Sequence, residues 1–499
     1  MKTKLKQSSV EIEPAAYILL DSRRHHLRSR RILTCVALIA VAATVGACVD
    51  RRELVTGDQL TALEGATLID GTGGPPVASA AVILSGKQIL RVGRVGQFRY
   101  PSGVTVHDLS GRYIIPGFID MHVHPRVGAE RATMQMLLAF GITTVRIPGL
   151  GFDAPDDLGL RLRDQIARDE LVGPRVFTGG KIIEGPRKTF PDDVEVRSEV
   201  EMRAEVRRQA ALGVDLVKLY WSTPIEFIRA AVDEAHSLGL QVVGHLRQTS
   251  WTEAARVGID GLVHSAGDGP SWELAPPGSR DELRVLPYRQ RYARLQELVK
   301  LDSPWFRDLA IALVDNHVTV DPTLVIMQTL YFGDDLSVLH RLEPELAPPA
   351  VLASWGKNWD KGNPFVLENV GSQDLTYGKG MFTMALGIVR QFHERGVRLA
   401  AGTDVGMPWI TPGVSFHREL ELLVQAGIPP SQVLLIATKN GAEGLRTLTK
   451  FGTIAPGMSA DLLVLRDDPT RDIHNTRSIE AVYKEGQRFD PRALLSQLR

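Results

Sequence analysis

The chain has 499 residues, of which 44% are hydrophobic and 23% charged. This composition is that of a globular protein, and the length suffices for one or two large hydrophobic cores. Acidic and basic side chains balance at 58 each, so the chain lacks the basic excess that binds nucleic acids.

The N-terminus has the pattern of an export signal. Basic residues end in "RRHHLRSRR", and an uncharged run follows from Ile32 to Cys48, "ILTCVALIAVAATVGAC". A basic region, an apolar stretch and small residues before a cleavage site are typical of such signals. A transmembrane helix is the alternative, but it needs about 20 apolar residues, slightly more than this run offers. We therefore expect residues 1–47 to be removed.

The end of this run, Val45 to Cys48, resembles a bacterial lipobox, and "SRRILT" at residues 29–34 partly resembles a twin-arginine export signal. A lipobox cysteine becomes the lipidated first residue, so Cys48 is expected to anchor the exported protein to a membrane, on the periplasmic or cell-surface side. The mature chain would carry 50 basic and 55 acidic side chains, a net charge of −5, which argues against a nucleic-acid partner. The two cysteines are Cys35, which would be lost, and Cys48, so no disulfide or thiol chemistry is expected.

Residues 60–112 and 451–499 are predicted to form two halves of one small β-sandwich domain, which a linker at residues 48–59 joins to the anchor. Short apolar runs separated by turn residues fill both segments, as in "LTALEGATLIDGTG" (60–73) and "FGTIAPGMSADLLVLRDDP" (451–469). The sandwich would therefore contain both ends of the folded chain.

Residues 113–450 repeat one pattern, in which a helical stretch ends at glycine and a short β-branched run follows, as in "AALGVDLVKLY" (210–220). Glycine after the last turn closes a helix, and the apolar run suits a strand that is buried on both faces. Eight candidate strands lie at residues 113–124, 137–147, 174–180, 210–220, 235–245, 254–264, 315–325 and 393–404. This alternation predicts an α/β fold, and the number of units favours a (β/α)8 TIM barrel over an open doubly wound sheet.

Two segments do not fit the repeat, residues 268–303 and 330–378. Both are rich in Pro, Trp, Arg and Tyr, and each follows a predicted strand. Long connections at such places are often lids or binding loops, so we expect these insertions to shape a substrate pocket. A solvated surface insertion is the alternative.

Six polar residues fall at or near predicted strand ends: His122, His124, Lys218, His245, His264 and Asp404. In a (β/α)8 barrel the carboxyl ends of the strands line the active site, so this fold would bring the six together. Imidazole and carboxylate groups suit a divalent metal such as zinc. Four histidines and an aspartate exceed the needs of one catalytic ion, so two ions with a hydroxide between them are expected. Lys218 has the wrong charge for this role, and a buried lysine needs a partner or a shifted pKa.

Several motifs together resemble the amidohydrolase superfamily, and most closely its prolidase and imidazolonepropionase-related members. They are "PGFIDMHVHP", "VDLVKLY", "VVGH", "GLVHS", "AGTDVG" and "GTIAPGMSADLLVL", in the family's order over residues 60–490. The resemblance implies that carbon dioxide converts Lys218 to a carbamate that bridges two metal ions. Asp404 would be the catalytic residue, which takes a proton from the attacking hydroxide and passes it to the leaving group. The implied ligands are His122, His124 and Asp404 for one ion, and His245 and His264 for the other.

Structural roles are the alternatives for these residues. The histidines could be packed in a core, Asp404 could cap a helix, and Lys218 could form an ion pair or a Schiff base. A Schiff base would leave four histidines without a role.

Other polar residues lie near the same strand ends. Tyr220, two residues after Lys218, is expected to contact substrate. Arg247 is expected to meet a substrate carboxylate unless it forms a surface salt bridge. His417 is expected to support a metal ligand, and Asp120 to be a structural partner.

These observations predict an amidohydrolase that cleaves an amide or peptide C–N bond of a small molecule with a metal-activated hydroxide. The leading substrate classes are Xaa-Pro dipeptides and N-acyl amino acids. A lactonase, a carboxylesterase or a phosphotriesterase on the same binuclear site is the first alternative. The second is a surface lipoprotein that binds without catalysis, which the intact ligand set disfavours. The oligomeric state stays open, a homo-oligomer included.

Overall fold

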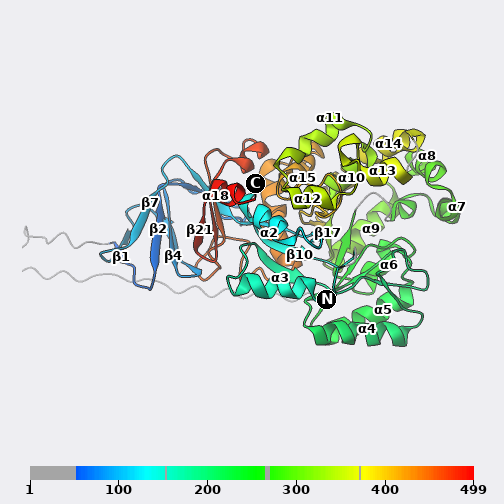
Figure 1. Cartoon of the computed structure of the whole chain (residues 1–499), viewed down its shortest axis with the longest axis horizontal. Helices are drawn as coiled ribbons and strands as arrows, with labels where there is room; N and C mark the ends of the chain where they lie inside the picture. Colours follow the sequence, from blue (N-terminus) through cyan, green and yellow to red (C-terminus); the bar gives the residue numbers. More distant parts are fainter. Residues whose placement is uncertain (1–51, 152–153, 265–269, 370–371, 499) are drawn as a thin grey trace, which may run out of the picture. The chain divides into compact units, whose positions relative to one another are not determined.

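The computed structural model describes residues 52–151, 154–264, 270–369 and 372–498 (Figure 1). Apart from Arg52, they belong to one compact unit, Glu53–Arg499. The predicted export signal and Cys48 lie outside the described residues. Within those residues, no helix is both long enough and apolar enough to cross a membrane.

Eight parallel strands lie at the places where the sequence predicts them. They are β9 (Phe118–Asp120), β10 (Ile142–Ile147), β11 (Arg175–Thr178), β14 (Leu216–Leu219), β15 (Gln241–Gly244), β16 (Gly261–Val263), β17 (Thr319–Asp321) and β18 (Arg398–Leu399). They pair in chain order, β9 to β11 in one sheet and β14 to β18 in another. The short strand β12 (Ile183–Glu184) pairs with β14, and β13 (Val194–Glu195) pairs with β12 at the edge of that sheet. The α/β class is therefore confirmed, and the carboxyl ends of all eight strands point the same way.

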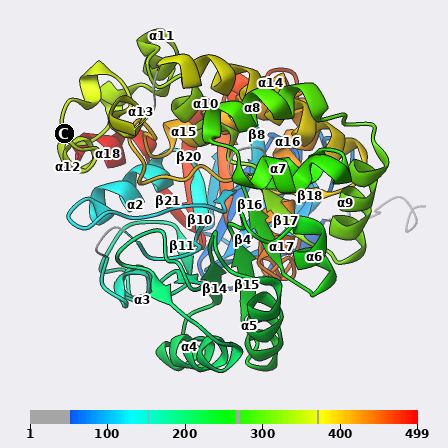
Figure 2. The same cartoon turned by 90° about the vertical axis from the view of Figure 1, so that its right-hand side faces the viewer.

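Backbone pairing also connects the two sheets to each other. Gly179 pairs with Leu216 in a parallel bridge, which brings the end of β11 beside β14. A second parallel bridge joins Val123, just after β9, to Val405, after β18. Figure 2 shows these strands at the centre with helices around them.

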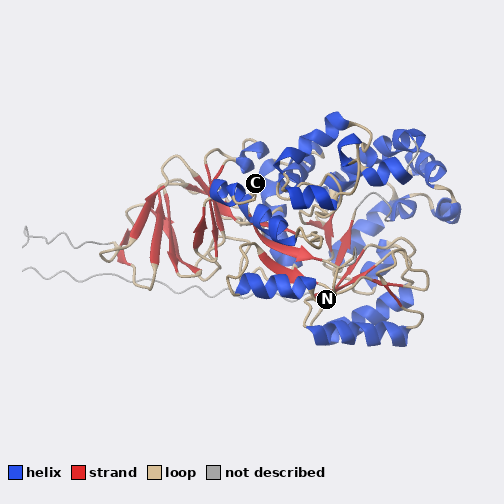
Figure 3. Cartoon of the chain, viewed as in Figure 1, coloured by secondary structure: helices blue, strands red, loops and turns tan. Residues whose placement is uncertain are grey.

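Helices follow the strands and cover them on the outside (Figures 2 and 3). They are α2 (Glu130–Ala139), α3 (Leu158–Ala167), α4 (Glu199–Leu212), α5 (Ile225–Ser237), α6 (Trp251–Arg256), α9 (Pro304–Asp315), α14 (Ser372–Glu394), α15 (Val414–Gln425), α16 (Pro430–Ile436) and α17 (Lys439–Gly444). The predicted glycine ends are confirmed. Gly213 closes α4 with a φ of 88°, in the left-handed region. The other glycines of the repeat also have positive φ: Gly141, Gly239, Gly258 and Gly396.

Both ends of the described chain contribute to two further sheets, which form the strand-rich region of Figure 3. One has the order β21-β20-β19-β8-β3 and the other β5-β4-β2-β7. Their bounds are β2 (Leu60–Glu64), β3 (Thr67–Leu68), β4 (Ala80–Ser85), β5 (Gln88–Arg94), β7 (Thr105–Asp108), β8 (Tyr113–Pro116), β19 (Leu462–Leu465), β20 (Ile479–Lys484) and β21 (Gln487–Phe489), with β1 (Glu53–Leu54) and β6 (Phe98–Arg99) as a separate pair. One hydrophobic cluster, with Leu63 and Val82 from the second sheet and Leu462 from the first, joins the two sheets. The short helix α18 (Pro491–Ser496) follows β21.

The two predicted insertions are largely helical. The first contains α7 (Arg280–Val285) and α8 (Tyr288–Leu298), and the second α11 (Leu336–Leu339), α12 (Pro349–Ser354) and α13 (Pro364–Asn369). Between them α10 (Leu324–Tyr331) follows β17 directly. Three tryptophans attach the second insertion to the segment after β18, because Trp355 and Trp359 pack on buried Trp409 with ring centroids 6.2 and 5.4 Å away.

Candidate metal centre

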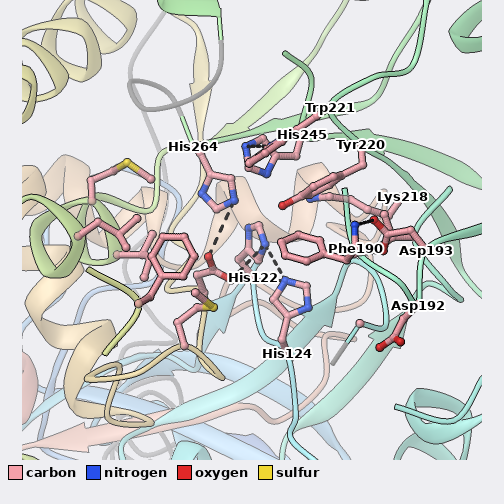
Figure 4. Close-up of a pocket in the computed structure, with 18 of the residues that line it drawn as sticks. His122, His124, Phe190, Asp192, Asp193, Lys218, Tyr220, Trp221, His245 and His264 are labelled. Carbon is pink, nitrogen blue, oxygen red and sulfur yellow. Dashed lines mark hydrogen bonds and ion pairs between the residues drawn. The ribbon is translucent and has the colours of Figure 1, made fainter. Parts of the chain in front are cut away.

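The carboxyl ends of the parallel strands surround a cavity of about 430 Å³ (Figure 4). Tyr220 lines it, as do all six predicted ligand residues: His122, His124, Lys218, His245, His264 and Asp404. Parallel strands bring together side chains that lie up to 282 positions apart, His122 and Asp404 being the extremes. The cavity is therefore at the edge where the sequence predicts an active site.

His122 and His124 direct two nitrogen lone pairs at each other. Asp321 Oδ2 accepts a hydrogen bond from His122 Nδ1 at 2.8 Å, and the Gly149 carbonyl accepts one from His124 Nδ1 at 2.8 Å. Both Nδ1 atoms therefore carry the proton, and both Nε2 atoms carry a lone pair. The two Nε2 atoms are 3.1 Å apart. Two facing lone pairs repel unless a cation lies between them, so this pair is suited to a metal ion.

Asp404 completes a set of ligand atoms with the spacing of one metal site. Its Oδ1 lies 3.4 Å from His124 Nε2 and 3.7 Å from His122 Nε2. Ligand atoms at about 2.0–2.1 Å from a tetrahedral zinc ion are about 3.4 Å from one another. The three observed separations scatter around this value, so the donor set fits a divalent metal without rearrangement.

His264 lies on the other side of the same carboxylate. Its Nδ1 donates to Thr323 Oγ1 at 2.6 Å, so Nε2 carries the lone pair, 3.9 Å from Asp404 Oδ2. The ligand atoms of His122, His264 and Asp404 all lie within 4.8 Å of one another. Asp404 thus has an oxygen toward each of two groups of histidines, as a pair of ions would require.

His245 lies in the cavity, but its ring is hydrogen-bonded differently. Its ring centroid is 4.4 Å from that of His264. Trp221 Nε1 donates to His245 Nε2 at 3.0 Å, which places the proton of the neutral ring on Nδ1. For a metal ion to bind at His245 Nδ1, the proton on Nδ1 would have to move to Nε2. Nε2 could then no longer accept the hydrogen bond from Trp221.

Lys218 is buried in β14 without a charge partner at hydrogen-bond distance. The side chain is 1% exposed, and Nζ has no hydrogen-bond partner. Burial lowers the pKa of Lys218 to about 7, so much of it is a neutral amine near neutral pH. Gly149 makes room for this side chain, because a Cβ at Gly149 would lie 3.0 Å from Lys218 Cβ. The buried amine of Lys218 thus lies beside the candidate metal ligands without the anionic partner that a buried ammonium group needs.

The cavity keeps its histidines neutral and its aspartate partly protonated. Burial lowers the pKa of all four histidines, that of His124 to about 3, so they have lone pairs at neutral pH. Burial also raises the pKa of Asp404 to about 7. A pKa near neutrality suits a group that takes up and returns a proton.

Buried groups that the sequence analysis missed orient the ligands. Asp321, which holds His122, also accepts from Arg146 Nη2 at 2.8 Å, and both residues are fully buried. Arg146 is a basic residue within the apolar strand β10, as Lys218 is within β14. The same sequence pattern could therefore have identified it. Asp120, expected to be structural, accepts from the His122 and Thr403 amides at 3.0 and 3.1 Å.

Backbone conformation marks two of the ligand positions. His264 and Asp404 each have a φ of 64°, in the left-handed region that residues other than glycine seldom adopt. His264 directly follows β16, and Asp404 lies in the segment after β18. Strained positions of this kind persist where the surrounding structure holds them, and they concentrate at functional sites.

Two predicted residues lie elsewhere. Arg247 is not among the described residues that line the cavity, because its guanidinium Cζ lies over the Trp221 ring, 4.5 Å from the centroid. Its contact with substrate stays a prediction. His417 uses both ring nitrogens on Thr476 Oγ1 and the Phe140 carbonyl, at 2.9 and 3.1 Å. The expectation that His417 supports a metal ligand is therefore wrong, because both ring nitrogens contact residues that are not candidate ligands.

The chain is similar to one known protein family over two long segments. A model of the amidohydrolase family matches residues 113–265 and 387–489, just over half of the chain. The matched segments contain all six predicted ligand residues. The unmatched residues between them, 266–386, include both insertions, so these segments are not part of the pattern common to the family.

Individual proteins are similar over different lengths. N-acyl-D-aspartate deacylase from Alcaligenes xylosoxydans xylosoxydans is 41% identical over 115 residues, which are 22% of this chain and 21% of that protein. The matched region thus spans about a fifth of that relative. A solved Xaa-Pro dipeptidase with methionine bound in its active site covers 86% of this chain and 100% of its own, with a TM-score of 0.63 and 20% identity. Bottromycin amidohydrolase covers 88% and 91%, with a TM-score of 0.67 and 20% identity. At these identities the structural matches show the fold alone.

Proposed function

The chain belongs to the amidohydrolase family; from this premise we propose that it is a hydrolase that acts on carbon–nitrogen bonds and that it cleaves an amide bond of a small molecule at a binuclear metal centre. The observation that carries the proposal is the spacing of three ligand atoms, from His122, His124 and Asp404. Their separations of 3.1, 3.4 and 3.7 Å suit a single metal ion.

The proposal includes the architecture that holds this centre. The eight parallel strands would close a (β/α)8 barrel, and the bridges from Gly179 to Leu216 and from Val123 to Val405 support the closure. The sheets from residues 60–112 and 451–499 would form a small β-sandwich domain, which their shared hydrophobic cluster supports. The active site at the carboxyl ends of the strands follows from that architecture.

The ligand residues divide between two ions. His122, His124 and Asp404 would hold one divalent ion, His245 and His264 the other, and Lys218 would bridge them as a carbamate. Bound there, two ions, which we propose to be zinc, would acidify a water molecule and polarise the amide carbonyl. The neutral, unpaired amine of Lys218 supports the carbamate, because carbon dioxide reacts with an amine only in its unprotonated form.

Asp404 would carry the proton during the reaction. A carboxylate oxygen of Asp404 would accept the proton of the attacking water and return it to the departing nitrogen, which must be protonated to leave. Asp321 and Arg146 would keep the His122 ring in the tautomer that presents Nε2 to the cavity.

A hydrolysis assay tests the function. Starting classes are Xaa-Pro dipeptides and N-acyl amino acids, which the names of similar proteins suggest, together with neutral amides, lactones, esters and phosphotriesters. The purified protein is stripped with a chelator and then supplied with zinc and bicarbonate. We expect amide hydrolysis that is lost when the metal is removed and restored when zinc and bicarbonate are added. Asp404→Asn should abolish this hydrolysis although the variant still binds metal. Turnover of lactones or phosphotriesters without any amide would assign the other activity to the site. Full metal content with no turnover of any compound would contradict the proposal.

We also propose that the protein is exported and held at a membrane by a lipid on Cys48. Residues 29–48 support this proposal through their signal and lipobox pattern. Cys48→Ala should move the protein from the membrane fraction to the soluble fraction. An unchanged membrane fraction, with no incorporation of labelled fatty acid in the unaltered chain, would contradict the anchor.

A further inference from the structure

The cavity has a hydrophobic wall that both insertions help to build. Tyr292 comes from α8 in the first insertion and Phe365 from α13 in the second. Between them, α10 contributes Ile326, Met327 and Leu330. All of these residues fall between the two segments that the family model matches.

Two tyrosines join the insertions at this wall. Tyr292 and Tyr331 are 1% and 3% exposed, and their hydroxyl groups are 3.1 Å apart. Their rings meet edge to face, with centroids 5.9 Å apart. This contact fixes the first insertion to the end of α10, so the wall is a preformed surface.

The opposite side of the cavity is also largely apolar. Phe190 and Tyr220 line it with ring centroids 5.9 Å apart, and Trp221 stacks on Tyr220 at 5.3 Å. Figure 4 shows these rings beside His245 and Lys218, and Tyr220 packs edge to face on His245 with ring centroids 4.8 Å apart. A substrate that reaches the metal ligands would therefore contact aromatic or aliphatic surface on both sides.

Apart from the proposed metal ions, the side chains that line the cavity disfavour an anionic substrate. Asp192 and Asp193 line it together with Asp404. Among the described lining residues, Lys218 is the only lysine, and none is an arginine. The proposed function uses Lys218 as a carbamate, which would turn this single base into an anion. A substrate carboxylate near the scissile bond would lose its hydration without gaining a cationic partner from these side chains.

From this arrangement we infer that the substrate is an amide with a bulky hydrophobic group, which binds against the wall of the two insertions, and with no carboxylate beside the scissile bond. This inference rests on the proposed function and deepens it. It separates the substrate from free dipeptides and N-acyl amino acids, which carry a carboxylate two bonds from the amide nitrogen. Tyr292 and Leu330 are then specificity-determining residues.

A pair of isosteric amides tests the charge preference. N-phenylacetyl-phenylalanine and N-phenylacetyl-phenylalaninamide differ only in a carboxylate against a carboxamide, and racemic compounds prevent stereochemistry from hiding the result. With the zinc-loaded protein we expect kcat/KM for the carboxamide to exceed that for the carboxylate at least about tenfold. We also expect the carboxamide to exceed N-acetyl-glycinamide at least about tenfold, because the small compound leaves the wall uncovered.

A substitution that adds a cation to the wall should reverse the preference. Leu330 is half-buried, so Leu330→Arg can place a guanidinium at the cavity and should raise the carboxylate-to-carboxamide ratio about tenfold. Leu238→Arg is the matched control, since Leu238 is 45% exposed at the end of α5, away from the cavity. The control ratio should equal that of the unaltered protein. Tyr292→Leu should raise KM for the phenylacetyl compounds more than for N-acetyl-glycinamide while the metal content stays constant.

The outcomes distinguish the inference from the function on which it rests. Hydrolysis with a preference for the carboxylate member would overturn the inference and leave the proposed function standing. An unchanged ratio in Leu330→Arg would place the discrimination outside this wall and also overturn it. Failure of the metal-loaded protein on all three compounds and on the wider amide panel would overturn the proposed function itself.

Discussion

Replacing Asp321 by asparagine separates two roles of one buried carboxylate. Asp321 Oδ2 accepts from His122 Nδ1 and its Oδ1 from Arg146 Nη2, at 2.8 Å each, and the side chain is fully buried. Asparagine keeps the shape but has one oxygen, so it cannot accept from both partners. The substitution should therefore weaken both the fold around Arg146 and the metal affinity of His122.

The structure sets the expected size of both effects. Arg146 is 2% exposed and stays charged, so loss of its partner leaves an uncompensated buried cation. Such a loss costs about 3–5 kcal/mol, and we expect the lower end, about 3 kcal/mol, because Arg146 Nε still donates to the Met121 carbonyl at 2.8 Å. Removing the carboxylate behind a ligand histidine lowers metal affinity by about 10–100-fold.

Two measurements check these effects independently. Urea unfolding of the metal-free protein reports stability without a contribution from bound metal. It is done at pH 8, because burial raises the pKa of Asp321 to about 6 and the carboxylate is ionised at the higher pH. Competition with a chromophoric chelator reports metal affinity. Asp302→Asn, at an exposed aspartate, is the matched control.

A second substitution tells the two roles apart. In the double variant Asp321→Asn, Arg146→Met no buried cation remains, so part of the lost stability should return while the metal affinity stays low. The reasoning is refuted if Asp321→Asn destabilises by less than about 1 kcal/mol and keeps its metal affinity within about threefold of the original.

Two further predictions concern other buried groups. Lys218→Ala should lose metal and activity together, with partial recovery on addition of a small carboxylic acid such as propionate. Lys450→Ala, at an exposed lysine, is the control and should lose neither. Full metal content and turnover in Lys218→Ala would exclude the carbamate. Glu419 accepts from the Leu324 and Val325 amides at 3.0 and 2.7 Å, and burial raises its pKa to about 8. Because the folded state holds this proton more tightly than the unfolded state, its contribution to stability is present below about pH 4.5 and is lost as the pH rises through 8. Glu419→Gln should make the urea midpoint less dependent on pH over this range, and parallel pH profiles for the two proteins would contradict the assignment.

Local patterns in the sequence were sufficient for the strands and for most of the cavity-lining polar residues. A glycine with positive φ follows five helices of the repeat, as at Gly213, because that conformation is a local property of the residue. Histidines at strand ends predicted the cavity because parallel strands all present their carboxyl ends at one edge. The cavity contains His122, Lys218 and His264 for this reason.

Contacts between distant segments could not be predicted from local patterns in the sequence. Asp321 and Arg146 hold His122 from strands 199 and 24 positions away, and no local spacing in the chain links the three. The ring of His245 has a tautomer set by Trp221, and the guanidinium of Arg247 packs on the same indole. Such side-chain choices depend on which neighbours fill the remaining space.

The amino-acid sequence by itself determined the class of fold, the repeated strand–helix order and the choice of candidate metal ligands, because each depends on periodicity and on residue type at a strand end. Tertiary structure decided how those side chains are oriented and what surrounds them. The apolar wall of Tyr292, Leu330 and Tyr331 belongs to this second kind, since helices from two insertions must pack together before it exists. Reaction chemistry follows from residue identity, whereas substrate choice follows from packing.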